Sequence, residues 1–179
     1  RSSKYSESLD YYAQSLEISE QYGLVTREIS SLNNIGELCL DLERYTEALE
    51  YLVSAKRKTE QIQDSERCGV VLVNLAHGYY QLGAYDKAVS FINQAIRIQE
   101  KAVDKINLAK AKTILGLIRQ EQGDNKSAEA LHKESIEIAD SIGFSDGIIE
   151  AMHNLAKVLY EKEEFQSSLV MLQDALVLS

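Results

Sequence analysis

The sequence predicts an all-α protein built from stacked pairs of antiparallel helices. The first observation is a repeat, because a small residue recurs every forty residues with no insertion or deletion, at Ser8, Ala48, Ala88, Ala128 and Ser168. The second is the absence of proline from all 179 residues, so no proline ends or kinks a helix. A fixed period of this size indicates stacked supersecondary units.

The pattern around these small residues resembles the tetratricopeptide repeat. The preceding helix of that motif carries a large apolar residue, an apolar-small pair and a further large residue, here Leu72, Leu75-Ala76 and Tyr79; Leu32, Ile35-Gly36 and Cys39; and Met152, Leu155-Ala156 and Leu159. The second helix adds Tyr45, Tyr85 and Phe165 at its start and Ala55, Ala95 and Ala175 near its end. The forty-residue period without proline resembles the subclass found in kinesin light chains, in the adaptor LGN and in bacterial peptide-sensing regulators and signalling proteins. The resemblance implies a right-handed α-α superhelix of about four and a half repeats and nine helices.

The helices are expected in a simple order along the chain. A lone second helix comes first and four complete pairs follow, over Tyr5–Tyr22, Val25–Leu42, Tyr45–Gln63, Glu66–Leu82, Tyr85–Ala102, Asp104–Gln122, Asn125–Ser141, Ser145–Lys162 and Phe165–Leu178. Because no proline follows the second helices, we expect both helices of a pair to be long, about 16–18 residues.

Glycine is expected to end two of these helices in a left-handed conformation, at Gly83 and Gly123. Glu43 and Glu163 stand at the same repeat position in the other pairs. Because a side chain makes positive φ more costly, those two turns should be slightly strained. Small residues such as Gly36 should let the two helices of a pair approach closely.

We expect residues 1–179 to form a single array that is a fragment of a longer chain. The half repeat covers residues 1–22, and the helix pairs cover 23–63, 64–103, 104–142 and 143–179. The last helix is apolar nearly all round, whereas a solenoid end needs a polar cap. Val170, Met171 and Val177 are therefore expected to meet a further repeat, another domain or a second copy of the chain.

Composition excludes several classes of partner. The formal charge of −9 disfavours nucleic acid, which needs a basic stripe. No apolar run approaches the ~18 residues that cross a bilayer, and no signal-peptide pattern opens the chain. We expect a cytoplasmic protein that does not enter membranes. Cys39 and Cys68 match no metal or redox spacing, which predicts two reduced thiols.

No motif points to catalysis, a cofactor or a metal. The nine glycines form no dinucleotide-binding fingerprint or phosphate loop, and no His-Glu-x-x-His is present. Glu129-x-x-His132 and Glu150-x-x-His153 have the spacing of di-iron bundle ligands. The repeat register places His132 inward and Glu150 and His153 on an exposed first-helix face, so the two pairs should not converge. We predict no enzyme activity and no metal site.

Partner binding is assigned to first-helix residues that the core does not require. The resemblance implies that these residues line a concave groove. The candidate residues are Asn34, Glu37, Asn74, His77, Tyr80, Ile114, Leu117, His153, Asn154, Lys157 and Tyr160. His77 is interpreted as a solvated groove residue rather than a base, because no carboxylate is spaced to orient it.

Three of these candidates form a column of asparagines at one register position, Asn34, Asn74 and Asn154. A side-chain amide can pair with the N–H and C=O groups of an extended peptide. The alternative is that each Asn bonds a neighbouring helix and serves packing.

Two other candidates interrupt this polar pattern, because Ile114 and Leu117 stand where other repeats are polar. Either they anchor a partner side chain, or the helix is rotated so that Ala111, Leu115 and Ile118 do the packing.

We therefore predict a non-catalytic scaffold that binds a protein or an extended peptide, as the regulatory or sensing segment of a larger, bacterial signalling protein. The alternative is a dimerisation or spacer module that acts through its terminal helices, including a homodimer through the C-terminal helix.

Overall fold

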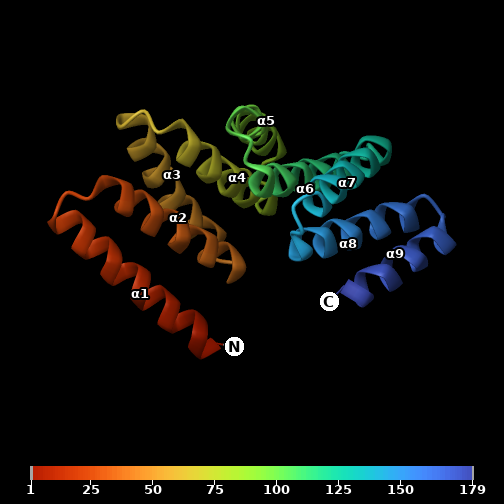
Figure 1. Cartoon of the computed structure of the whole chain (residues 1–179), viewed down its shortest axis with the longest axis horizontal. Coiled ribbons are helices and arrows are strands. Elements are labelled where there is room, and N and C mark those ends of the chain that lie inside the picture. The colour runs from red at the N-terminus through yellow and green to blue at the C-terminus, as the bar shows by residue number, and fades with distance from the viewer. Residues whose placement is uncertain (1, 179) are drawn as a thin grey trace. The chain divides into compact units, whose positions relative to one another are not determined.

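The computed structural model describes residues 2–178, and over this range the chain forms nine α-helices and no strand (Figure 1). The helices are α1 Ser2–Gln21, α2 Val25–Asp41, α3 Tyr45–Gln61, α4 Ser65–Gln81, α5 Tyr85–Ala102, α6 Lys105–Glu121, α7 Asn125–Asp140, α8 Ser145–Glu161 and α9 Phe165–Leu178. Each predicted helix agrees with the observed one to within three residues at either end. Helices α2 to α8 have 16 to 18 residues, as the missing proline predicts.

The chain divides into two compact units, Arg1–Phe91 (unit 1) and Ile92–Ser179 (unit 2), and the division falls inside α5. In unit 1, α2 packs against α1 and α3, and α4 packs against both α2 and α3. In unit 2, α7 packs against α6 and α8, α8 contacts α6, and α9 packs on α8. Figure 1 shows that α1 and α2, and likewise α8 and α9, lie side by side and run in opposite directions. The expected single array of residues 1–179 stays a prediction.

All eight turns between helices are built in the same way. Each contains one residue with positive φ, and these residues follow one another every twenty positions: Gly23, Glu43, Gln63, Gly83, Val103, Gly123, Gly143 and Glu163. The left-handed conformations predicted for Gly83 and Gly123 are confirmed, with φ of 71° and 78°. In the first of these turns the Ala84 N–H donates to the Tyr79 carbonyl and the Gly83 N–H to the Tyr80 carbonyl, which satisfies the last carbonyls of α4.

Glutamate takes the same backbone conformation at two other turns, with φ of 59° at Glu43 and 63° at Glu163. A side chain at positive φ is sterically disfavoured, so these turns carry the strain that their sequence predicts. Three helix starts are stabilised by aspartate caps. The carboxylates of Asp64, Asp104 and Asp124 accept backbone N–H bonds from the residue three positions later, at 3.0 to 3.1 Å.

The small residues of the repeat lie where helices approach most closely. Ala48, Ala88 and Ala128 are fully buried. A Cβ built on Gly36 of α2 would lie 2.6 Å from Leu52 Cγ of α3, so only glycine fits there without displacing Leu52. In unit 2 the core includes a cluster of Ala109, Ala139, Ile148, Met152 and Ala175, to which α6, α7, α8 and α9 all contribute. Between residues 2 and 178, no helix is long and apolar enough to cross a bilayer.

Candidate functional site

A surface hollow lies between α8 and α9, within unit 2. Its volume is about 610 Å³, and it is lined by His153, Ala156, Lys157, Tyr160, Glu161, Ser168 and Leu172, which together define the α8/α9 hollow. Three of the predicted binding residues, His153, Lys157 and Tyr160, therefore meet in one place. Their spacing of four and then three residues puts them on one exposed face of α8, while Leu155 and Val158 point into the core.

The α9 side of the hollow was not predicted. Ser168 takes the small-residue position of the repeat, and its hydroxyl donates to the Ala156 carbonyl at 2.7 Å, which fixes α9 against α8. Leu172 is 43% exposed, although its counterpart in α3, Leu52, is fully buried. The sequence predicts contacts of the last helix through Val170, Met171 and Val177, but it does not single out Leu172 as a binding residue. The sequence does show that Leu172 stands at a repeat position that is apolar and buried in α3, where Leu52 occupies it.

One aromatic ring, that of Tyr160, and two charged side chains, Lys157 and Glu161, line the hollow. Tyr160 and Phe165 pack edge to face, with ring centroids 5.2 Å apart and an interplanar angle of 65°. Glu161 accepts a 2.7 Å hydrogen bond from the Gln120 amide of α6. Lys157 is exposed and has no acidic partner among the residues that the structure describes. The hollow thus combines the apolar side chains of Ala156 and Leu172 with one ammonium group, that of Lys157, and one carboxylate, that of Glu161.

The predicted residues of unit 1 lie in different surroundings. Asn34 and Glu37 help to line a smaller hollow of about 150 Å³ between α1 and α2, together with Ser8, Tyr12, Leu38 and Asp41. On α4, His77 lies 3.1 Å from the Gln81 amide through Nε2, and the Tyr80 ring packs on Tyr85 at 6.1 Å between centroids.

Two of the three asparagines of the column, Asn74 and Asn154, are buried inside the protein. The Asn74 amide of α4 donates to the Asn33 side chain of α2 at 3.0 Å, and both residues are buried. Asn154 is also buried, whereas Asn34 is half-buried. The Asn74 bond is the helix-to-helix contact of the packing alternative. A role of this column in peptide binding stays a prediction.

Ile114 and Leu117 of α6 differ in exposure. Ile114 is buried, whereas Leu117 is half-buried. The neighbouring Thr113 hydroxyl lies 2.8 Å from the Ser135 hydroxyl of α7, which in turn donates to the Ala109 carbonyl. This face of α6 therefore packs against α7, and Ile114 has the environment of a core residue.

The residues of the two Glu-x-x-His pairs lie in different surroundings. His132 is fully buried against Gly116 of α6, where a Cβ would lie 2.6 Å from the imidazole Cε1. Neither ring nitrogen has a hydrogen-bond partner in the described part of the chain, and burial lowers the pKa of His132 to about 4. Glu150 and His153 are exposed on α8. Among residues 2–178, no three His, Cys, Asp or Glu side chains are placed to hold a metal ion.

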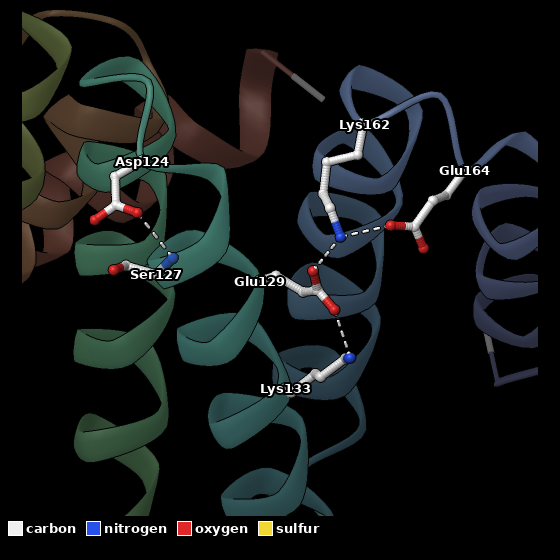
Figure 2. A network of polar contacts seen from close by, with 6 residues as sticks. All are labelled: Asp124, Ser127, Glu129, Lys133, Lys162 and Glu164. Atoms are coloured by element: carbon white, nitrogen blue, oxygen red, sulfur yellow. Dashed lines mark hydrogen bonds and ion pairs between the residues drawn. The ribbon is translucent and has the colours of Figure 1, made fainter.

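Glu129 instead joins a polar network on α7 and α8 (Figure 2). Its carboxylate accepts from Lys133 at 2.6 Å and from Lys162 at 2.7 Å, and Lys162 also pairs with Glu164 at 2.5 Å. These two lysines lower the pKa of Glu129 and keep it ionised. The network connects α7 to the turn between α8 and α9, so Glu129 has a structural role.

A comparison with protein families agrees with this geometry. A family model described as "Tetratricopeptide repeat" matches residues 1–55, 27–101 and 107–177. No curated protein matches the chain by sequence.

Solved structures share the fold at low sequence identity. The apo form of RapI has a TM-score of 0.80 and 21% identity, with 99% of this chain and 62% of RapI covered. BtubC (BKLC) from P. vanneervenii has a TM-score of 0.78 and 18% identity, with 97% of this chain and 73% of BtubC covered. NprR in complex with its cognate peptide NprX has a TM-score of 0.74 and 16% identity, with 96% of this chain and 50% of NprR covered. The chain thus spans less than two thirds of RapI and half of NprR. With the family model matched over most of the sequence, the predicted all-α repeat fold is confirmed, and the chain belongs to the tetratricopeptide repeat family.

Proposed function

We propose that this chain is a non-catalytic interaction module that binds a protein or peptide partner, with the α8/α9 hollow as its principal site. The observation that carries the proposal is the convergence of His153, Lys157 and Tyr160 on an apolar floor. Exposed aromatic and cationic residues around a hollow are typical of binding surfaces. NprR, which has the same fold, was solved with a bound peptide, and this supports a peptide or protein as the ligand.

We assign no catalytic role to His132 or Glu129, two residues with shifted pKa values, because both have structural surroundings. His132 is enclosed between α6 and α7, and Glu129 is held by two lysines. The module would serve as the regulatory or sensing segment of a larger bacterial signalling protein. Both cysteines, Cys39 and Cys68, are free thiols, which fits a reducing cytoplasm.

The test is selection of peptides from a displayed random library against residues 1–179, followed by calorimetric titration of the selected sequences. The double variant Lys157→Glu, Tyr160→Ala should weaken binding about tenfold or more, because it removes the cation and the aromatic rim. Lys126→Glu is the matched control, since it makes the same charge change at the exposed start of α7. Ligands that bind the double variant and the control equally well would contradict the proposal.

A second candidate function is dimerisation through α9. The observation that favours it is a set of apolar α9 side chains exposed to solvent: Leu169, Val170, Leu172, Leu176, Val177 and Leu178. Large exposed apolar patches mark interaction sites in soluble proteins. Light scattering of wild type and Val177→Glu would test it, because Val177 is 85% exposed and its substitution leaves the core intact. A monomer in both cases would exclude the dimer.

A further inference from the structure

Another surface hollow lies on α7 and the C-terminal end of α8, within unit 2. Its volume is about 540 Å³, and its lining residues, Lys126, Glu129, Ala130, Lys133 and Lys162, define the lysine hollow. Three ammonium groups and one carboxylate share this surface, whereas the whole chain has a formal charge of −9. The lysine hollow is thus a local positive region on an acidic protein.

The repeat does not require these charges. No other repeat carries a basic residue at the positions of the three lysines, which hold Ser6, Thr46, Asp86 and Gln166; Ala13, Val53, Asn93 and Gln173; and Ser2, Leu42, Leu82 and Gln122. In α3 the positions of Glu129 and Lys133 are taken by Leu49 and Val53, so a second helix packs in this fold without charges there. The cluster therefore belongs to this part of the chain and not to the repeat.

The ammonium groups of Lys133 and Lys162 have hydrogen-bond donors that the protein does not use. Figure 2 shows the Glu129 carboxylate between them, with one oxygen at 2.6 Å from Lys133 and the other at 2.7 Å from Lys162. Lys162 also pairs with Glu164 at 2.5 Å. Because an ammonium group has three N–H donors, each lysine can still donate to a second carboxylate placed beside Glu129.

Lys126 extends the positive region along α7. Lys126 is exposed and forms no ion pair among residues 2–178, and the Asp124 carboxylate, which it attracts, accepts from the Ser127 N–H. Lys126 and Lys133 are seven residues apart, about 10 Å along the helix axis at 1.5 Å per residue. Two carboxylates three residues apart in a polyproline II segment lie on one side of that segment, about 9 Å apart. The two separations match.

We propose that the lysine hollow binds an extended acidic segment of a partner protein through carboxylates that are three residues apart. One carboxylate pairs with Lys126, and the next pairs with Lys133 and Lys162 beside Glu129. The argument for this occupant is charge complementarity, since three lysines face one carboxylate in the hollow. This surface is separate from the α8/α9 hollow and goes beyond the proposed function.

The helices that form the lysine hollow are all part of the described chain. Because α8 packs on α6 and α7, a further first helix would by the same rule pack on α8 and α9, and not on Lys126 or Lys133 of α7. A second copy of the chain could offer exposed carboxylates such as Glu163. Light scattering of wild type and Lys133→Glu tests this source, and a dimer that Lys133→Glu dissociates would overturn the proposal.

The probe is a synthetic peptide of four Glu-Gly-Ser repeats, which places a carboxylate at every third residue. One control peptide has the same composition with its four glutamates adjacent, and another has glutamine in place of glutamate. Binding to the isotope-labelled chain of 179 residues is followed by nuclear magnetic resonance titration at low salt. Because the chain is acidic as a whole, binding of an acidic peptide reports a local site. We expect the spaced peptide to bind about threefold to fivefold more tightly than the adjacent one, and the glutamine peptide not to bind.

Substitutions in the hollow should change this affinity in opposite directions. Lys126→Glu and Lys133→Glu should each weaken binding of the spaced peptide about fivefold, because each replaces attraction by repulsion. Glu129→Gln should tighten binding about threefold, because it removes the carboxylate that competes for Lys133 and Lys162. A purely structural Glu129 would not produce this gain. Lys101→Glu is the matched control, since Lys101 is exposed at the end of α5 and the charge change is the same.

Thermal unfolding of each variant checks that it is folded. Absence of binding at low salt, equal binding of the adjacent-glutamate peptide, equal weakening by Lys101→Glu, or no gain from Glu129→Gln would overturn the proposal. Ligands of the α8/α9 hollow should respond to Lys157→Glu with Tyr160→Ala and not to Lys126→Glu or Lys133→Glu. Either site can therefore fail its test while the other stands.

Discussion

The α2–α3 pair of unit 1 and the α6–α7 pair of unit 2 make the same close contact with different side chains. Gly36 faces Leu52 in the first pair, and Gly116 faces His132 in the second. A Cβ on either glycine would lie 2.6 Å from the facing side chain, and both facing side chains are fully buried. The two backbones thus approach equally, but one contact is apolar, whereas the other encloses an imidazole whose two nitrogens have no hydrogen-bond partner among residues 2–178.

This difference shows which property the repeat requires. The glycine sets the distance between the helices, and the facing position accepts a side chain that fills the space even when its polar atoms find no partner. Burying unpaired polar groups costs stability, so we expect the α6–α7 contact to stabilise the fold less than the α2–α3 contact does. It also makes unit 2 sensitive to pH, whereas the Leu52 contact is not titratable.

The largest expected effect is acid destabilisation of unit 2 through His132. Its pKa is about 4 in the folded protein and 6.5 in the unfolded chain, so the unfolded chain binds the proton first as the pH falls. The contribution of neutral His132 is fully present above pH 6.5 and is lost between pH 6.5 and 4, by about 3 kcal/mol of unfolding free energy. Urea unfolding at pH 7 and pH 4 measures the loss.

The matched control for this experiment is His132→Leu, which keeps every carboxylate. Glu129, Asp64 and Asp124 have lowered pKa values and also lose stability in acid, so some acid sensitivity is common to both proteins. The loss between pH 7 and pH 4 should be clearly smaller in His132→Leu. If wild type and variant lose the same free energy, His132 is not the sensitive group.

Adding a methyl group at the close contact should destabilise both pairs. Gly116→Ala and Gly36→Ala each place a Cβ against a buried side chain, and we expect a loss of roughly 2 kcal/mol after the higher helix propensity of alanine is included. Thermal and urea unfolding of the two variants provide the comparison. A large loss for Gly116→Ala with none for Gly36→Ala would show that the two contacts are not equivalent.

Replacing His132 by leucine should make unit 2 resemble unit 1. Leu52 already shows that leucine fits beside a glycine in this geometry, and the substitution removes two unbonded nitrogens from the core. At pH 7 we expect a gain of about 1 to 2 kcal/mol in unfolding free energy. The reverse change, Leu52→His, should cost at least as much. A destabilised His132→Leu would indicate that the imidazole has a bonding partner in solution.

Much of the fold follows from the sequence because the period of forty residues determines where helices start and end. The small residues, the inward position of His132 and the left-handed turns at Gly83 and Gly123 all follow from register alone. Register does not specify how closely neighbouring first helices approach. The Asn33–Asn74 bond depends on that approach, so the burial of Asn74 was only one of two predicted alternatives.

The candidate site was predicted in part for a related reason. His153, Lys157 and Tyr160 share a helix, and helical spacing is enough to place them on one face. Ser168 and Leu172 come from the next helix, and their role depends on whether another helix covers them. The ion pair of Glu129 with Lys162 does not follow from the sequence, because Lys162 lies 33 residues away at the end of another helix.

The smallest expected effect concerns two turns of unit 2 that occupy the same repeat position, Val103 between α5 and α6 and Gly143 between α7 and α8. Both have positive φ, 57° and 66°. Val103 is 73% exposed, so its side chain gains little from packing while its β-branch makes this conformation costly. Val103→Gly should therefore raise the unfolding free energy by about 1 kcal/mol, a relief of left-handed strain partly offset by the greater freedom of glycine in the unfolded chain. Gly143→Val should lower it by a similar amount, and both changes are measured by urea unfolding at pH 7. Destabilisation by Val103→Gly would mean that the valine side chain makes a contact that outweighs the strain of its backbone.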